Sequence, residues 1–349
     1  MLPYWFLFGT TAWMAFTCVP PEGIQARRWP GWWLVMFALL VLMIGLRHEV
    51  GGDWGQYLRH LENAEYETLV NDPAYGFLNL LAGKMGGGIY LVNTACAAFF
   101  SYGLAIFCRA QPRPWLALVV AVPYLIMVVA MGYTRQGAAL GLVMLGLVAL
   151  SERKLTNYVF FVALAAAFHK SAVVMMPLAV FAGTRNRLWT ALWICLLSAA
   201  WYTLLLQDSV SALNTNYMLA QYQSEGAAVR VAMNAVPGVI FLCFRRRFEM
   251  LESERNFWTW MSIGSLVFVG WLAVSPSSTA VDRMALYWIP LQLFVLSRLP
   301  DAVGKPNSRA MQFWIVAYCG AVQFVWLVFA SHAMYWVPYQ FYPWVLLWR

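Results

Sequence analysis

Residues 115–150 read WLALVVAVPYLIMVVAMGYTRQGAALGLVMLGLVAL, and Arg135 is the single charged residue among these 36. As one continuous helix the stretch would be about 54 Å long, well beyond the roughly 30 Å of a bilayer's hydrocarbon core. The chain must therefore turn back once, and its polar residues place the turn at Gly132-Tyr133-Thr134-Arg135-Gln136. The stretch predicts two membrane helices with an arginine at the turn between them.

The whole chain has a membrane composition. Of its 349 residues, 62% are hydrophobic and 11% are charged, whereas a soluble protein is roughly 45–50% apolar and about 25% charged. This excludes a water-soluble fold, and an aromatic content of 17% excludes disorder. The net charge of +8 is interpreted as membrane topology, so the lipid bilayer is the expected partner and nucleic acid is not.

Twelve apolar runs predict an all-α polytopic protein with about twelve transmembrane helices in a single domain, 1–349. The stretch 155–183 could be one tilted helix or two short helices broken at His169-Lys170. Only two helices put at least two basic residues in every inner loop, as the positive-inside rule expects, so we predict two, with both chain ends outside. The spans are expected near 2–19, 31–46, 88–107, 115–132, 136–150, 156–168, 171–183, 188–206, 229–244, 256–274, 284–298 and 311–332.

This topology places two longer segments, 47–87 and 207–228, on the outer side. Within the first, Pro73–Lys84 is too short to span a membrane and predicts an interfacial or re-entrant helix. Ionisable groups at membrane depth cost about 2.5–3.5 kcal/mol each, so their presence indicates function. The basic residues outside the inner loops are Arg47, Arg59, Lys84, Arg135, Lys170, Arg230, Arg283 and Arg349.

Four short polar clusters interrupt the apolar runs on the outer side. They are Arg47–Trp54 with Tyr57 one turn later, Tyr133–Gln136, Phe168–Ser171 and Asp282-Arg283. If the helices pack together, these clusters converge on one outward-facing, cation-rich recess. Each also has a structural interpretation, as a snorkelling cation, a packing histidine, a helix cap or a local ion pair. Arg135 fits such an interpretation least, because it lies in a tight turn between two long apolar runs.

The clusters, in this order, resemble the EpsG family of Wzy-type exopolysaccharide polymerases. The resemblance covers about residues 1–300 and implies a glycosyltransferase-C-like fold in a bacterial inner membrane, with its active site on the periplasmic face. One departure is Trp54, where a tyrosine is expected more often. The matching pieces are Arg47 with Gly52-Asp53-Trp54-Gly55-Gln56-Tyr57, Asp72-Pro73-Ala74-Tyr75-Gly76-Phe77, Arg135-Gln136-Gly137, His169-Lys170-Ser171-Ala172 and Asp282-Arg283.

The resemblance also implies a reaction. A glycan linked to undecaprenyl pyrophosphate would be transferred to the non-reducing end of another lipid-linked repeat unit. Cations would stabilise the leaving pyrophosphate, and a base would accept the hydroxyl proton. We expect catalytic roles for Asp53 or His169 as base and for Arg135, pyrophosphate binding by Arg47, Arg135, Lys170 and Arg283, and sugar binding by Trp54, Tyr57, Tyr75, Gln136 and Asp282.

No cofactor is expected. The six cysteines form no CxxC pair and no cluster with histidine, so zinc, haem and disulfide frameworks are not predicted. No metal ligand is assigned, although Asp53, Asp72 and Asp282 leave a divalent cation open as a participant. A chain-length regulator is a further partner that the sequence leaves open.

Three other functions compete with the polymerase. An O-antigen ligase, or another transferase of polyprenyl-linked sugars, would share the cationic recess and differ in its acceptor. A membrane acyltransferase would use His169 as base but needs a donor path from inside the cell. A transporter of lipid-linked oligosaccharides commonly shows internal repeats and midplane charges. This chain has no repeat, and its candidate functional charges gather at one face.

Overall fold

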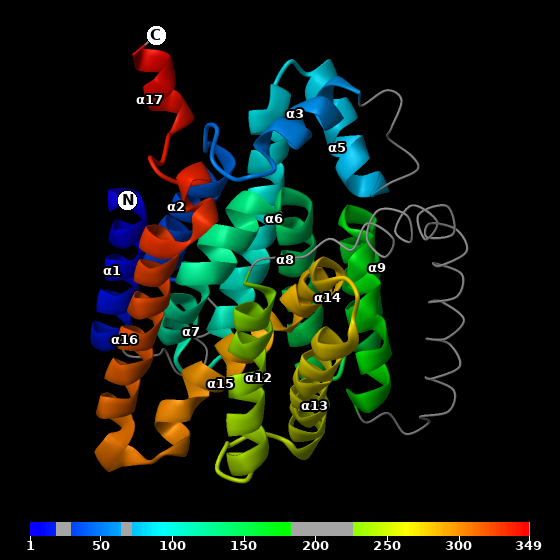
Figure 1. Cartoon of the computed structure of the whole chain (residues 1–349). Coiled ribbons are helices and arrows are strands. Elements are labelled where there is room, and N and C mark those ends of the chain that lie inside the picture. Colours follow the sequence, from blue (N-terminus) through cyan, green and yellow to red (C-terminus); the bar gives the residue numbers. More distant parts are fainter. Residues whose placement is uncertain (19–28, 64–71, 183–225, 349) are drawn as a thin grey trace.

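The computed structural model describes residues 1–18, 29–63, 72–182 and 226–348. Every named element in these ranges is a helix, which confirms the all-α prediction, and an isolated bridge joins Arg47 to Phe341. Figure 1 shows the helices gathered in one bundle. The elements at the predicted spans are α1 (Leu2–Thr17), α2 (Gly31–Gly45), α6 (Gly88–Arg109), α7 (Pro114–Ala121), α8 (Thr134–Ser151), α9 (Leu155–Phe168), the 3₁₀ helix η3 (Lys170–Ala182), α12 (Ala227–Phe244), α13 (Glu252–Val274), α15 (Ile289–Ala302) and α16 (Lys305–Phe329).

Five of the described helices are long and apolar enough to cross a membrane. They are Gly88–Arg109, Thr134–Ser151, Ala227–Phe244, Glu252–Val274 and Pro306–Phe329. Helices at Gly31–Gly45, Pro114–Ala130 and Leu155–Phe168 are apolar but shorter. The chain is therefore a membrane protein by the length and composition of its helices. The count of twelve and the glycosyltransferase-C-like arrangement stay predictions, and the expected span 188–206 and nearly all of segment 207–228 lie outside the described residues.

The chain turns back within 115–150, close to the predicted place. α7 continues as a π-helix, η2 (Val122–Ala130), in which Pro123 has no amide hydrogen to donate to an α-helical rung. Tyr133 is the one non-helical residue at the turn, since residues 131–132 are helical and α8 begins at Thr134. Arg135 and Gln136 consequently lie in the first turn of α8 rather than in a loop.

The stretch 155–183 forms two helices, as the charge distribution predicts. α9 ends at Phe168, His169 has an extended backbone (φ −155°, ψ 110°), and η3 begins at Lys170. The Tyr158 hydroxyl on α9 donates a hydrogen bond to the Met175 carbonyl oxygen on η3. A contact between residues 17 positions apart shows that the second helix folds back along the first.

Glycines bring α6 and α8 into close contact at the centre of the bundle. A Cβ added to Gly103 would lie 1.9 Å from the Gly141 carbonyl oxygen, and one added to Gly141 would lie 2.5 Å from Phe100 Cα. Close backbone approach at small residues is a common way for membrane helices to associate. This contact fixes α8, and with it the side chains at the start of α8, relative to α6.

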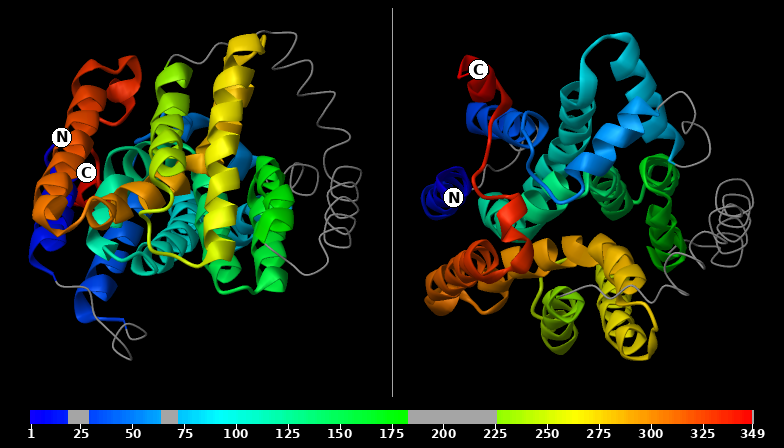
Figure 2. Two further views of the ribbon diagram at one scale, coloured as in Figure 1. Left: turned by 90° about the horizontal axis from the view of Figure 1, so that it is seen from below. Right: turned by 45° about the horizontal axis from the view of Figure 1, so that its top comes forward.

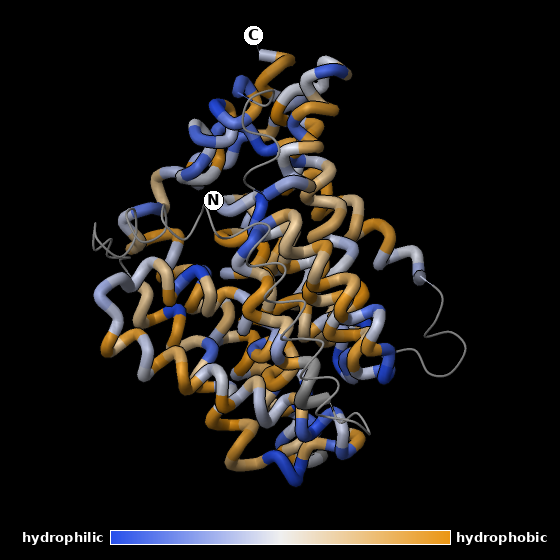
Figure 3. Tube along the Cα trace, turned by 90° about the vertical axis from the view of Figure 1, so that its right-hand side faces the viewer, coloured by the Kyte–Doolittle hydropathy of each residue, from blue (hydrophilic) through white to orange (hydrophobic). Residues whose placement is uncertain are grey.

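The two ends of the bundle carry different segments. At the upper end in Figure 1 lie α3 (Trp54–Glu62), α5 (Pro73–Lys84) and α17 (Tyr342–Leu347), and both termini lie toward this end. At the lower end lie the predicted inner loops, between α6 and α7, α12 and α13, and α15 and α16. Hydrophilic segments gather near both ends, with mostly hydrophobic chain between them (Figure 3).

Two groups of helices meet across the bundle. Figure 2 shows α2–α8 on one side and α12–α15 on the other, with α1 and α16 neighbouring at one edge. The second group includes the short helices α14 (Ser278–Ala285) and η6 (Leu286–Trp288), while η7 (Ser331–Tyr335) follows α16. The Gln136 amide on α8 donates a 2.6 Å hydrogen bond to the Arg283 carbonyl oxygen on α14, which ties the two groups together at the level where α8 begins.

Candidate functional site

Ionisable side chains from five separate parts of the chain meet around the start of α8. We call Asp53, Asp72, Arg135, His169, Lys170 and Arg283 the outer cluster. Asp53 precedes α3, Asp72 precedes α5, Arg135 begins α8, His169 lies between α9 and η3, Lys170 begins η3, and Arg283 is on α14. Clusters up to 230 residues apart in the chain thus come together, as the sequence predicts if the helices pack.

Asp72 joins three parts of the outer cluster. Its Oδ2 accepts a 2.9 Å hydrogen bond from Arg135 Nη1, and its Oδ1 accepts a 3.1 Å bond from the Lys170 backbone amide. Its Oδ2 also lies 3.6 Å from His169 Nδ1. With a side chain only 2% exposed, Asp72 is a buried anion that aligns the start of α8 with the break between α9 and η3.

The local sequence explains why the Asp72 carboxylate is available. Asp72 has left-handed backbone angles (φ 55°, ψ 68°), which aspartate tolerates better than most residues. Pro73 follows as the first residue of α5, where its fixed φ suits a helix start. The Asp72 side chain makes no capping hydrogen bond to α5, so both of its oxygens face Arg135 and Lys170 instead.

Arg135 is placed where an isolated cation would be disfavoured. It lies in the first turn of α8, where the helix dipole opposes a positive charge by about 0.3–1 kcal/mol. Asp72 compensates this cost, and the rings of Tyr57 and Tyr75 lie 5.9 Å and 5.6 Å from the guanidinium carbon. The side chain remains 23% exposed, so Arg135 is held firmly yet can reach a ligand.

The pKa values of Asp72 and His169 are both lowered, which gives the two residues different charge states at neutral pH. Burial would raise the pKa of the Asp72 carboxyl, but nearby His169, together with Arg135 and the Lys170 amide, lowers it to about 2. Burial lowers the pKa of His169 below 6.5, although Asp72 opposes this shift. At neutral pH Asp72 is therefore charged and His169 is neutral, with Nδ1 lacking a hydrogen bond among the described residues.

Asp53 differs from Asp72 in having no fixed partner. Within the described part of the chain its carboxylate makes no hydrogen bond or ion pair, and it begins α3 without capping it. Burial raises the pKa of Asp53, while the charges of Arg283 and Arg135 act in the opposite direction. The Arg283 guanidinium lies 5.9 Å from the Tyr133 ring, at the turn before α8. Asp53 thus lies near Arg283 and Arg135 without forming an ion pair with either.

Arg47 is buried beneath the outer cluster rather than in it. Only 1% of the residue is exposed. Its guanidinium donates to the carbonyl oxygens of Ile44 (2.5 Å) and Val50 (3.2 Å) and to Thr134 Oγ1 (2.7 Å). These bonds fix the chain leading to Asp53 against the start of α8. The expected role of Arg47 in pyrophosphate binding stays a prediction.

The aromatic residues expected at the site divide into two groups. Tyr57 and Tyr75 are buried, pack edge to face at 5.9 Å and contact Arg135. Trp54 lies instead beside His48 and Tyr90, at ring distances of 6.0 Å and 6.1 Å. The tyrosines therefore support the outer cluster directly, while Trp54 belongs to a neighbouring aromatic group.

Asp282 pairs with an arginine that sequence reasoning left out of the site. Both carboxylate oxygens of Asp282 accept 2.6 Å hydrogen bonds, from Arg230 Nε and Nη2 on α12. This bidentate pair joins α12 to α14 just before Arg283. Arg230 is one of the eight basic residues that the sequence places outside the inner loops, and this placement was the only sequence signal for it. Asp72 entered the sequence analysis as the residue before Pro73 in a matched motif and as one of three aspartates that leave a divalent cation open.

No three His, Cys, Asp or Glu side chains in the described residues lie close enough together to hold a metal ion. Two of the three aspartates that left a divalent cation open, Asp72 and Asp282, bind arginines. The start of α8 and the cations Arg135, Lys170 and Arg283 suit an anionic leaving group. The carboxylate of Asp53, which has no partner among the described residues, could accept a proton in the same reaction.

Comparisons with known proteins identify the family. The sequence model of the EpsG family matches residues 31–341. Searches of curated proteins and of solved structures give no match. The matched range includes every residue of the outer cluster, together with Arg47 and Arg230. The chain therefore belongs to the EpsG family.

Proposed function

We propose that the protein polymerises lipid-linked glycan repeat units at the outer face of a bacterial inner membrane. The observation that carries this proposal is the meeting of Arg135, Lys170 and His169 around the buried Asp72 at the start of α8. Membership of the EpsG family supports polysaccharide synthesis as the context. A cationic cluster at the membrane interface suits a substrate that joins a lipid to a pyrophosphate and a sugar.

In this reaction an acceptor hydroxyl attacks the anomeric carbon of a glycan carried on undecaprenyl pyrophosphate. A carbon–oxygen bond forms to the acceptor, the bond to the pyrophosphate oxygen breaks, and the hydroxyl proton passes to a base. Negative charge grows on the departing pyrophosphate. Arg135, Lys170 and Arg283, with the free amides at the start of α8, would stabilise that charge.

Asp53 is the better supported base of the two that the sequence leaves open. Its carboxylate has no hydrogen bond or ion pair among the described residues, and burial raises its pKa toward the useful range. His169 is neutral but lies against Asp72, with its side chain 13% exposed. We assign His169 and Asp72 to positioning Arg135, and Asp53 to proton transfer.

Sugar positioning follows from the same geometry. Tyr57 and Tyr75 pack around Arg135, so they would lie near the first sugar of a donor whose pyrophosphate binds Arg135. Gln136 is committed to the Arg283 carbonyl and Asp282 to Arg230. We assign Gln136 and Asp282 to holding α8, α12 and α14 in place.

The test is a reaction with purified protein in detergent, a synthetic lipid-pyrophosphate repeat unit, no nucleotide sugar and EDTA. A ladder of products spaced by one repeat supports the polymerase. A ladder that needs added Mg²⁺ supports the polymerase but gives a cation a role beside Asp53. Transfer of the glycan only to an added lipid A core would support the ligase instead, and transport of the substrate across liposomes without transfer would support the transporter.

A pair of variants links the activity to the outer cluster. Arg135→Ala should abolish the ladder while the protein remains folded, because it removes the cation nearest the leaving group. Arg59→Ala is the matched control: Arg59 is exposed on α3, at the same end of the bundle, and its side chain has no hydrogen bond or ion pair with a described residue. Retention of polymer by Arg135→Ala, or equal loss in both variants, would contradict the assignment.

A further inference from the structure

The lower end of the bundle contains a second cation-rich site, far from the outer cluster. A cavity of about 910 Å³ opens there, which we call the inner pocket. Its walls come from the end of α1, the segment before α7, the loop between α12 and α13, the end of α15 and the start of α16. These are segments that the positive-inside rule assigns to the inner side, so the pocket faces the inner leaflet and the cell interior.

Four arginines line the inner pocket, against two carboxylates, Glu249 and Asp301. Arg113 is paired with Asp301 at 2.7 Å, and Arg298 is paired with Glu254 at 3.2 Å. The other two arginines, Arg247 and Arg309, are exposed, and their side chains make no hydrogen bond or ion pair with any described residue, although the Arg247 guanidinium lies 5.5 Å from the Phe244 ring. The guanidinium groups of Arg247 and Arg309 are therefore available to donate hydrogen bonds to an anion in the pocket.

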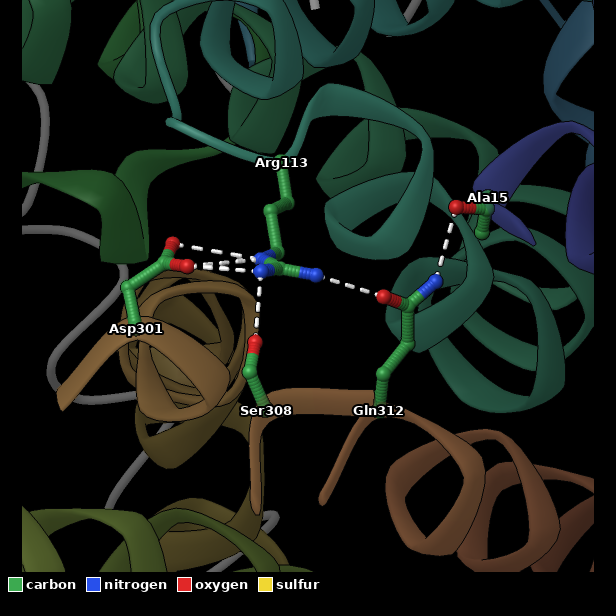
Figure 4. A network of polar contacts seen from close by, with 5 residues as sticks. All are labelled: Ala15, Arg113, Asp301, Ser308 and Gln312. Carbon is green, nitrogen blue, oxygen red and sulfur yellow. Dashed lines mark hydrogen bonds and ion pairs between the residues drawn. The ribbon is translucent and has the colours of Figure 1, made fainter. Parts of the chain in front are cut away.

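The wall of the pocket is preorganised by Arg113 (Figure 4). Its guanidinium donates to both oxygens of Asp301, to Gln312 Oε1 at 2.5 Å and to Ser308 Oγ at 2.7 Å. Gln312 in turn donates a 2.7 Å bond to the Ala15 carbonyl oxygen on α1. One arginine thus ties α1, α15 and α16 together, so the cavity is part of the folded bundle and not a gap between loose loops.

Apolar side chains share the pocket with the arginines. Trp115 and Phe248 are buried in its wall, and Phe16 at the end of α1 exposes half of its surface. An arginine-lined pocket with an apolar side fits an amphipathic ligand better than a purely polar one. Arginine binds phosphate through two parallel hydrogen bonds and keeps its charge at every physiological pH.

We propose that the inner pocket binds a phosphate-bearing ligand, supplied by the headgroup of an anionic phospholipid of the inner leaflet. Arg247 and Arg309 would donate hydrogen bonds to the phosphate. Arg113 and Arg298 in the pocket wall would attract it electrostatically. Phe16 and Trp115 would contact the acyl chains. Basic pockets between membrane helices on the cytoplasmic side commonly bind such headgroups. This site is independent of the polymerase reaction proposed for the outer cluster.

The test measures binding rather than polymerisation. Purified protein in a neutral detergent is titrated with phosphatidylglycerol, phosphatidylcholine or inorganic phosphate, and bound ligand is counted by native mass spectrometry. Phosphatidylglycerol should bind, and the double variant Arg247→Gln/Arg309→Gln should weaken that binding at least about tenfold, since charge-assisted hydrogen bonds are lost at both arginines. Both arginines are exposed, so the variant should fold.

The double variant Arg245→Gln/Arg246→Gln is the matched control. These arginines are exposed in the loop that also holds Arg247 and are absent from the pocket wall, and the charge change equals that of the first double variant. The control should change affinity by no more than about twofold. Equal losses in the two variants, or equal binding of phosphatidylcholine, would overturn the proposal. Displacement of phosphatidylglycerol by millimolar inorganic phosphate would support the anion site and assign it to soluble phosphate.

Discussion

The Asp72–Arg135 ion pair gives the sharpest test of how the outer cluster is held. Asp72→Asn keeps the shape of the side chain but removes its charge, leaving Arg135 and the Lys170 amide with a weaker acceptor. An ordinary aspartate pKa of 3.8 and a folded value of about 2 correspond to about 2.5 kcal/mol of stabilisation at neutral pH. Breaking a fully buried pair costs about 3–5 kcal/mol, and the 23% exposure of Arg135 reduces this. We expect a loss of about 2–3 kcal/mol.

The assay is a double-mutant cycle on the free energy of unfolding. Asp72→Asn, Arg135→Gln and the double variant are unfolded in mixed micelles at neutral pH and followed by tryptophan fluorescence. The double variant should be more stable than the sum of the single losses predicts, by about 1–3 kcal/mol. Additive losses, or an Asp72→Asn variant within about 0.5 kcal/mol of the parent, would refute the pairing as a source of stability.

The pH dependence of the same cycle has a definite sign. Because the folded pKa of Asp72 lies below its unfolded value, its stabilisation is complete above about pH 4 and is lost as pH falls toward 2. The difference between the parent and Asp72→Asn should therefore stay constant from about pH 6.5 to pH 8, where Asp72 is charged and His169 is neutral. A difference that changes within that range would mean that a group other than Asp72 controls the cluster.

Three further predictions concern the base, the helix contact and the second ion pair. Asp53→Asn should lower kcat at least about 100-fold and remove the acidic limb of the pH–rate profile. In the parent this limb should lie above pH 3.8, because burial raises the pKa of Asp53. An unchanged profile would exclude Asp53 as the base. Gly103→Leu should abolish folded protein in size-exclusion chromatography, whereas Gly270→Leu, with open space at its Cβ, should not, and equal yields would contradict the close packing. Arg230→Lys keeps the charge but not the two 2.6 Å bonds to Asp282, so a lower melting temperature is expected; an unchanged one would show that the bidentate geometry contributes nothing.

Arg47 shows why a residue's role at the site needs the tertiary structure. Its place beside a matched motif predicted a pyrophosphate ligand. In the fold its guanidinium is buried and bonded to Ile44, Val50 and Thr134. Whether an arginine binds a ligand or its own backbone depends on which acceptors lie within reach, and Thr134 is 87 residues away in the sequence.

Asp72 and Arg230 show the opposite case. Neither stood out beyond the other outer charges, because a single carboxylate or arginine near an apolar run has many structural explanations. Packing brings Asp72 to Arg135 across 63 residues and Arg230 to Asp282 across 52. Each residue is recognised as part of the site only through its ion-pair partner, and the packing of the helices determines which residue that partner is.

The sequence by itself determined the helical class, the turn within 115–150, the break at His169 and the end of the bundle where the site lies. These follow from local quantities: the length of an apolar run against the bilayer, and the charge of each loop. Only the tertiary structure decided which charges pair, that Asp53 has no fixed partner among the described residues, and that four arginines at the lower end of the bundle line a cavity. Those outcomes depend on contacts between segments distant in the chain, which bilayer length and loop charge do not encode.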